Sequence, residues 1–159
     1  MVENVIGTTL RLGQETLTIK ELVEIHGKPD LVGIYFGAHW APPCRLFTPA
    51  LTEFYQKINE KGKRMEIIFC SNDGNEAAFE RNYATMPFAA IPYIDEQRIQ
   101  NLKQRYGING IPTLVVLDFN RGGELISYDG RADLQNHSEG ALEIWLKKAM
   151  EVAAGQSVK

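Results

Sequence analysis

The sequence predicts an α/β fold in which a mixed β-sheet is sandwiched by helices. Two nearly continuous apolar runs, residues 31–36 and 65–70, are typical of strands that are buried on both faces. A helical pattern lies between them, and this alternation indicates parallel strands at the centre of the sheet. A β-branched run at 113–117, turn residues at 120–123 and a second run at 124–128 then predict a hairpin, which adds antiparallel strands at one side.

The amino-terminal part of the chain predicts an extension to this core. Residues 8–11 and 15–19 fit a short hairpin around Gly13, and a brief helix through residues 22–25 follows. After the first central strand, apolar side chains recur at steps of four, three and four, which predicts an amphipathic helix that ends near residues 61–63. This apolar stripe consists of Phe47, Leu51, Phe54 and Ile58.

Three more helices are expected towards the carboxyl terminus. Two lie at residues 76–83 and 97–106, and the second of them has one apolar face. Ser138 is expected to cap the last helix, which a polar tail follows at 153–159. The shared face of that last helix consists of Leu142, Trp145, Leu146 and Ala149.

Length and composition restrict the class of protein. The chain has 159 residues, of which 44% are hydrophobic and 23% charged, as in ordinary globular proteins. We expect a single domain over residues 1–159, with its core at about 30–150, because no repeat or linker interrupts the chain. The net charge of −3 favours neither nucleic acid nor an anionic membrane as a partner. A monomer is expected.

Targeting and metal signals do not stand out in the sequence. Residues 1–11 lack the pattern of a secretory signal, and no run approaches the roughly 20 apolar residues that span a bilayer. The expected location is therefore cytoplasmic. No spacing of histidines and cysteines indicates a metal site, so we expect no metal and no other cofactor.

The most informative segment reads Trp-Ala-Pro-Pro-Cys-Arg at residues 40–45, between a predicted buried strand and a predicted helix. Two cysteines separated by two residues form a redox-active pair at such a place, because the helix N-terminus stabilises a thiolate. Here Ala41 stands at the first position of the pair and Cys44 at the second. The only other cysteine, Cys70, lies in a segment of different character, so reduced thiols are expected.

Residues 35–49 resemble the active-site segment of the thioredoxin superfamily, and more specifically its tryparedoxin and nucleoredoxin branch. Four later segments resemble this branch in the same order, which is stronger evidence than one motif. They are residues 70–73, 86–93, 106–114 and 129–131. The resemblance covers about residues 30 to 132 and implies a thioredoxin fold, here with an N-terminal β-hairpin extension.

The resemblance also implies chemical roles. In this family the first cysteine attacks a substrate disulfide, and the second resolves the mixed disulfide that results. Those positions are Ala41 and Cys44, so we expect a thiol–disulfide oxidoreductase of tryparedoxin or nucleoredoxin type whose dithiol exchange is disabled by Ala41. Its implied partners are protein disulfide substrates and a dithiol electron donor. An engineered change and a natural loss both explain Ala41, and Cys44 is also consistent with a small buried hydrophobic residue.

Five residues are expected to bind substrate: Trp40, Pro42, Pro43, Ile111 and Pro112. The resemblance implies that Pro112 has a cis peptide bond, lies against the active-site loop and presents the preceding backbone to an extended substrate. Proline is the residue for which the cis form costs least, about 0.5 to 1 kcal/mol. Pro42 and Pro43 suit the first turn of a helix, and Trp40 is expected to form part of an exposed apolar docking surface.

Proton transfer requires a further group. Tyr35 occupies the position at which many thioredoxins have a buried aspartate, as it does in the tryparedoxin-like branch. Asp73 and Arg131 match polar positions of the family near the loop, which makes them candidates for an ion pair or a proton relay. A solvated turn and a surface charge explain these two residues equally well.

Two other functions fit the same residues. The first is a redox-inactive binding module, in which the cis-proline groove holds extended polypeptide through backbone hydrogen bonds. The second is monothiol chemistry at Cys44, which we disfavour because that position is normally shielded from solvent.

Overall fold

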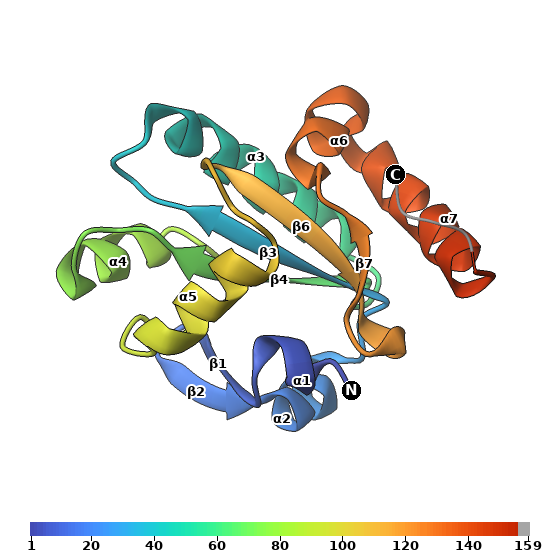
Figure 1. Cartoon of the computed structure of the whole chain (residues 1–159), viewed down its shortest axis with the longest axis horizontal. Helices are drawn as coiled ribbons and strands as arrows, with labels where there is room; N and C mark the ends of the chain where they lie inside the picture. The colour runs from blue at the N-terminus through green and yellow to red at the C-terminus, as the bar shows by residue number, and fades with distance from the viewer. Residues whose placement is uncertain (156–159) are drawn as a thin grey trace.

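A computed structural model describes residues 1–155 as one seven-stranded sheet with helices on both faces (Figure 1). The strands are β1 Thr9–Leu12, β2 Glu15–Thr18, β3 Leu31–Gly37, β4 Met65–Ser71, β5 Ala89–Ala90, β6 Thr113–Asp118 and β7 Glu124–Ser127. The α-helices are α1 Glu3–Ile6, α2 Ile19–His26, α3 Pro42–Ile58, α4 Glu76–Tyr83, α5 Glu96–Arg105, α6 Gly130–His137 and α7 Ala141–Ala153. Two short 3₁₀ helices, η1 Phe119–Arg121 and η2 Ser138–Gly140, complete the described elements.

The strand order is β2-β1-β5-β4-β3-β6-β7. Strands β3, β4 and β5 are parallel at the centre, whereas β6 runs antiparallel to β3. Every residue of β3 and of β4 is buried, which confirms the strands predicted from the two apolar runs. The β6–β7 and β1–β2 pairs are antiparallel, so the predicted hairpins at both sides of the sheet are confirmed. This is the thioredoxin fold with a central mixed sheet.

The side chains of β3 alternate between two hydrophobic cores, as the period of two in a strand requires. Leu31 and Tyr35 point to the core that α3, α4, α6 and α7 cover. Val32, Ile34 and Phe36 point to the core that α1, α2 and α5 cover. The sheet is therefore closed by helices on both faces, and functional groups become accessible at the ends of its strands.

One such end positions the candidate site. Phe36 of β3 pairs with Thr113 of β6 and Cys70 of β4. Because β6 starts where β3 ends, the segment before β6 and the loop that connects β3 to α3 lie at the same edge of the sheet (Figure 1). Strand β4 ends at this edge as well, so three chain segments that are distant in sequence meet there.

Two arginines hold the N-terminal extension on this core. Arg11 of β1 pairs with Glu80 of α4 and stacks over the rings of Phe79 and Tyr83, with its guanidinium carbon 5.6 and 5.2 Å from the ring centres. Arg98 of α5 donates to the backbone of the first residues, at 3.2 Å to the carbonyl of Ile6 and 2.8 Å to that of Thr9. The extension is thus an integral part of the fold.

The structure corrects the prediction around the last helix. Ser138 does not cap it, because α7 begins at Ala141 after Gly140. Ser138 instead ends helix α6, which the sequence analysis did not predict, and its backbone N–H donates to the carbonyl of Leu134. Helix α6 buries only Gly130 and Leu134, so it lacks the apolar stripe on which the prediction relied. The last four residues of the predicted tail, 156–159, lie outside the described residues.

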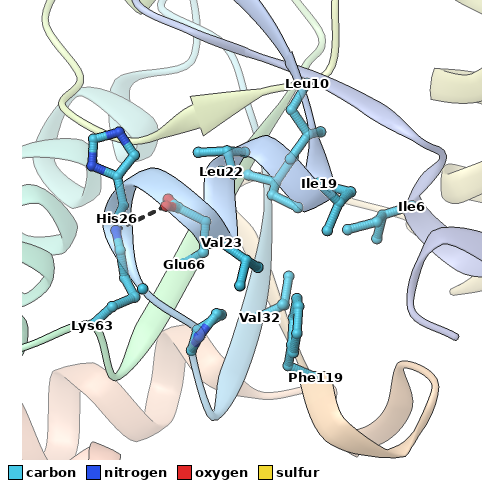
Figure 2. Close-up of a pocket in the computed structure, with 13 residues that line it drawn as sticks. Ile6, Leu10, Ile19, Leu22, Val23, His26, Val32, Lys63, Glu66 and Phe119 are labelled. Atoms are coloured by element: carbon cyan, nitrogen blue, oxygen red, sulfur yellow. Dashed lines mark hydrogen bonds and ion pairs between the residues drawn. The ribbon is translucent and has the colours of Figure 1, made fainter.

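A small apolar cavity lies at the other end of the sheet, where β3 begins (Figure 2). Its volume is about 20 Å³, which is room for one water molecule, and Leu22, Val32 and Phe119 are among its lining side chains. Lys63 and Glu66 form an ion pair of 2.9 Å beside it. None of the residues predicted to form the site lines this cavity. Within residues 1–155, no helix combines the length and the apolar character needed to cross a membrane.

Candidate active site

The loop between β3 and α3 places Ala41 at the beginning of a helix. Ala41 is the N-cap of α3, with extended backbone angles, and Pro42 and Pro43 form the first helical turn. The carbonyl of Ala41 accepts hydrogen bonds from the backbone N–H groups of Cys44 at 2.9 Å and of Arg45 at 3.3 Å. The two prolines cost no hydrogen bond here, because the first N–H groups of a helix have no partner within it. The methyl group of Ala41 is itself only 5% exposed.

Cys44 lies in the first turn of α3 and is 1% exposed. It is a free thiol and lines a pocket of about 200 Å³, together with Thr48 of α3 and Asn82 and Thr85 near the end of α4. Cys70 is also free, but it lies within β4 with no exposed surface, and burial raises its pKa to about 12. The shielded position expected for Cys44 and the burial expected for Cys70 are both present.

A hydroxyl pair that the sequence analysis missed lies beside Cys44. The hydroxyl groups of Tyr35 and Thr48 are 2.6 Å apart, and Tyr35 is buried. The pKa of Tyr35 is raised chiefly by its burial; the hydrogen bond to Thr48 opposes this, and the neighbouring Cys44 adds to it. The sequence signal that could have indicated this contact was the spacing of four residues between Cys44 and Thr48, which puts them on the same side of one helix. Gly37 allows this arrangement, since a Cβ there would lie 2.7 Å from the Tyr35 ring.

Trp40 is exposed, as expected for a docking surface. Its side chain is 61% accessible to solvent, and its indole N–H donates to the carbonyl of Asn72 at 2.9 Å. The neighbouring Pro42 and Pro43 are exposed as well. His39 faces solvent, and its carbonyl accepts a hydrogen bond of 2.8 Å from Arg45. An apolar, solvent-facing surface with a fixed indole ring therefore lies at the start of the helix.

The segment before β6 contributes the other side of the site. The peptide bond between Ile111 and Pro112 is cis, the isomer that the resemblance implies. Pro112 is buried and Ile111 is half-buried. Because Thr113 pairs with Phe36, Pro112 lies one step further along, beside the residues that lead from β3 into the loop.

The two candidates for a proton relay have different surroundings. Asp73 is buried, and its carboxylate accepts hydrogen bonds from the backbone N–H of His39, the hydroxyl of Ser71 and the amide of Asn82. Arg131 is half-buried at the start of α6, and its Nε atom is buried with no hydrogen-bond partner in the described chain. Among residues 1–155, no ion pair joins Asp73 to Arg131. The arrangement does not form the ion pair considered from the sequence.

A resident metal has no obvious ligands in this part of the chain. Within residues 1–155, no three side chains of histidine, cysteine, aspartate or glutamate are grouped so that they could hold a metal ion. The chemistry available at this edge of the sheet includes a thiol, the hydroxyl groups of Tyr35, Thr48 and Ser71, a buried carboxylate and an exposed indole ring.

Comparison with known proteins identifies similar chains. A family model described as thioredoxin-like matches residues 28–124. Nucleoredoxin from Bos taurus is 44% identical over 137 residues, which cover 86% of this chain and 30% of that protein. The chain thus spans just under a third of the length of the nucleoredoxins from animals that it matches.

Solved structures of single-domain size are similar over nearly their whole length. Native tryparedoxin I from Crithidia fasciculata is 35% identical with a TM-score of 0.78, and the match covers 87% of this chain and 93% of that one. A cysteine-to-alanine mutant of tryparedoxin-I is 34% identical, also with a TM-score of 0.78, and the match covers 88% of this chain and 94% of that one.

Proposed function

This chain belongs to the thioredoxin-like family, in its tryparedoxin and nucleoredoxin branch, and we propose that it is a thiol–disulfide oxidoreductase scaffold whose dithiol exchange is disabled by Ala41. One observation carries the proposal. Ala41 caps α3 in front of two prolines, and the buried thiol of Cys44 follows three residues later. The position that requires a nucleophile thus holds a methyl group, while the rest of the site is present.

The reaction of an intact site shows what is missing. A thiolate at position 41 would attack a substrate disulfide, form a mixed disulfide and release the first substrate thiol. The Cys44 thiolate would then attack the sulfur at position 41 and release the second thiol, which leaves a protein disulfide. A dithiol donor would reduce that disulfide and restore the site. Two electrons pass to the substrate in each cycle, and Ala41 prevents the first step.

We assign the five apolar residues beside the loop to substrate binding. Trp40 and Pro43 are exposed on one side, and Ile111 and Pro112 lie at the start of β6 on the other. Pro42, which lies between Trp40 and Pro43 in the sequence, stiffens that turn. The partners that we propose for these residues are protein disulfide substrates, with a dithiol electron donor for turnover. We further propose that the chain acts as a monomer, as one domain over residues 1–159, in the cytoplasm, where free thiols such as Cys44 stay reduced.

Restoring the missing sulfur tests this function. The protein with Ala41→Cys should reduce insulin disulfides in the presence of a dithiol, while the unchanged chain should stay at the background rate. Ala41→Ser is the matched control, because it adds an atom of similar size that forms no disulfide. Folded Ala41→Cys protein without activity towards insulin or glutathione disulfide would contradict the proposal.

The exposure of Trp40 supports a second candidate function, a redox-inactive module that holds extended polypeptide at the cis-proline groove. Binding would then need no sulfur. Calorimetric titration with a carboxymethylated insulin chain distinguishes the two. Under this second function the unchanged chain binds that polypeptide, a reductant has no effect on the affinity, and Trp40→Ala weakens it.

A further inference from the structure

The Asp73 carboxylate lies at the carboxyl end of β4 and touches the backbone of the active-site loop. It is 6% exposed. One oxygen accepts a hydrogen bond from the N–H of His39 at 2.9 Å. The other accepts from the hydroxyl of Ser71 at 2.7 Å and from the side-chain amide of Asn82 at 3.3 Å. A loop residue is thereby tied to strand β4 and helix α4 through a single side chain.

The main chain of Asp73 is itself held from several sides. Its N–H donates to the hydroxyl of Ser71 at 2.9 Å, and its carbonyl accepts from the hydroxyl of Tyr93 at 2.7 Å. The N–H of the preceding Asn72 donates to the carbonyl of Gly37 at 2.8 Å, which joins this turn to the end of β3. The backbone that carries the Asp73 carboxylate is therefore held in place, which a side chain that anchors a loop requires.

These contacts do not resemble those of a proton relay. The hydrogen bonds of the carboxylate are with the loop, the strand end and α4. In the described part of the chain, none joins it to Cys44 or to Arg131. A group that shuttles a proton needs hydrogen-bond contact with the reacting atom, directly or through one water. An anchor needs only the contact with His39.

We infer that Asp73 is a positioning residue, which fixes the backbone at His39 and so sets how residues 40 and 41 are presented to a substrate. Trp40 follows His39 directly, and its indole N–H bonds to the carbonyl of Asn72, next to Asp73. Ala41 follows in turn at the N-cap of α3. The significance of this anchor for catalysis rests on the function proposed above, whereas its effect on the loop does not.

Loss of the carboxylate leaves a donor without an acceptor. A hydrogen bond from a neutral N–H to a charged carboxylate is stronger than one between two neutral groups. Removing the acceptor leaves the N–H without a partner, and the protein then bears the full desolvation free energy of that donor. Asparagine at position 73 would retain an acceptor for His39 and present an amide to Ser71, whose hydroxyl oxygen can accept. The side-chain amide of Asn82 would turn so that its oxygen, in place of its NH₂, faces residue 73. Alanine would retain none of these side-chain hydrogen bonds. These two substitutions separate the hydrogen bond from the charge.

Amide hydrogen exchange on the unchanged Ala41 background tests the anchor directly. With Asp73→Ala, the N–H of His39 should exchange at least about tenfold faster, because its partner is gone. With Asp73→Asn, the rate should stay within about threefold of the original. Asp30→Asn is the matched control, since this half-exposed carboxylate pairs with Arg64 and lies away from the site. Equal rates at His39 in all three variants would overturn the inference.

Activity in the Ala41→Cys protein tests the consequence for catalysis. Positioning predicts that Asp73→Ala lowers kcat/KM at least about tenfold, that Asp73→Asn restores most of it, and that the pH profile keeps its shape. Equal loss in both variants together with a shifted pH profile would instead show a proton relay and overturn the assignment. If Ala41→Cys alone is inactive, the proposed function fails, while the exchange experiment still decides whether Asp73 holds the loop.

A milder substitution covers the case in which Asp73→Ala unfolds. Asn82→Ala removes one contact with the carboxylate and leaves the contact with His39 in place. A smaller increase in exchange at His39, of about twofold to fivefold, is expected in a protein that melts as one cooperative unit. No increase at all, with Asp73→Ala also without effect or unfolded, would count against the anchor.

Discussion

Cys44 and Cys70 are both free and almost fully buried, yet their surroundings differ in kind. Cys70 is part of the core between the sheet and helices α1, α2 and α5, in the last two residues of a fully buried strand. Cys44 lies in the first turn of α3, beside the hydroxyl groups of Tyr35 and Thr48 and next to a pocket of about 200 Å³. Burial alone therefore does not distinguish Cys70 from Cys44, the thiol that we propose belongs to the site. Cys44 differs by its position at a helix start, its polar neighbours and an adjoining pocket.

The largest expected effect concerns which of the two thiols forms a disulfide with a cysteine introduced at position 41. When Ala41→Cys protein is oxidised with a mild disulfide, position 41 should pair with Cys44 in nearly all molecules, because the two positions share one helical turn. Cys70 should stay reduced, since it lies in β4 within the apolar core. Peptide mapping by mass spectrometry measures the pairing.

Cys44→Ser in the Ala41→Cys protein is the control for this pairing, and it should leave the new cysteine free or joined to a small thiol. A substantial fraction of disulfides between position 41 and Cys70 would contradict this prediction, because it would mean that Cys70 can reach position 41.

The next largest effect is expected in the alkylation rates of Cys44 and Cys70 in the unchanged chain. With iodoacetamide at pH 8 we expect Cys44 to react at least about tenfold faster than Cys70. Cys44 adjoins a pocket, whereas Cys70 has no exposed surface, and a thiol with pKa about 12 is scarcely ionised at that pH. The reaction of Cys70 needs its thiolate, so its rate should rise as the pH is raised above 8. Mass spectrometry of digested samples gives both rates.

Unfolding in guanidinium chloride provides the control for alkylation, because both thiols should then react at similar rates. Faster alkylation of Cys70 than of Cys44 in the folded chain would reverse the comparison.

Replacing each cysteine with serine should show a smaller difference between the two positions, in the free energy of unfolding. Cys70→Ser places a hydroxyl in the apolar core and should lower the free energy of unfolding by about 2 kcal/mol. Cys44→Ser should cost less than about 1 kcal/mol, because the Tyr35 and Thr48 hydroxyl groups lie alongside. Urea denaturation followed by circular dichroism measures both. Equal losses would mean that the polar neighbours of Cys44 do not accommodate a hydroxyl.

The sequence predicted the elements whose pattern is strong. Strands β3 and β4 are buried along their whole length, so their apolar composition was sufficient. Helix α6 and strand β5 escaped prediction for physical reasons. The helix buries two of its eight residues, and the strand consists of two alanines held by pairing with β4 and β1. Such elements depend on tertiary contacts, which no local period reveals.

The site was predictable in its residues and less so in its contacts. The positions of Ala41, Cys44 and Pro112 followed from motifs, and the structure brings them to one edge of the sheet. The partners of Asp73 did not follow, because they come from the loop and from α4. From the sequence, Asp73 and Arg131 were candidates for an ion pair or a proton relay, and a solvated turn and a surface charge explained them equally well. Only the three-dimensional arrangement shows that the carboxylate bonds to a backbone N–H.

The smallest expected effect concerns the hydroxyl pair that distinguishes the surroundings of Cys44. Tyr35→Phe removes the partner of the Thr48 hydroxyl and should lower the free energy of unfolding by about 1 kcal/mol, as should Thr48→Val. The double variant should cost less than the sum of both, since the second change removes a group that has already lost its partner. Alkylation of Cys44 should change with Tyr35→Phe, whereas that of Cys70, on the other face of the sheet, should not. Strict additivity in the double variant would mean that the two hydroxyl groups contribute independently, and the polar character of the Cys44 environment would then depend on the pocket alone.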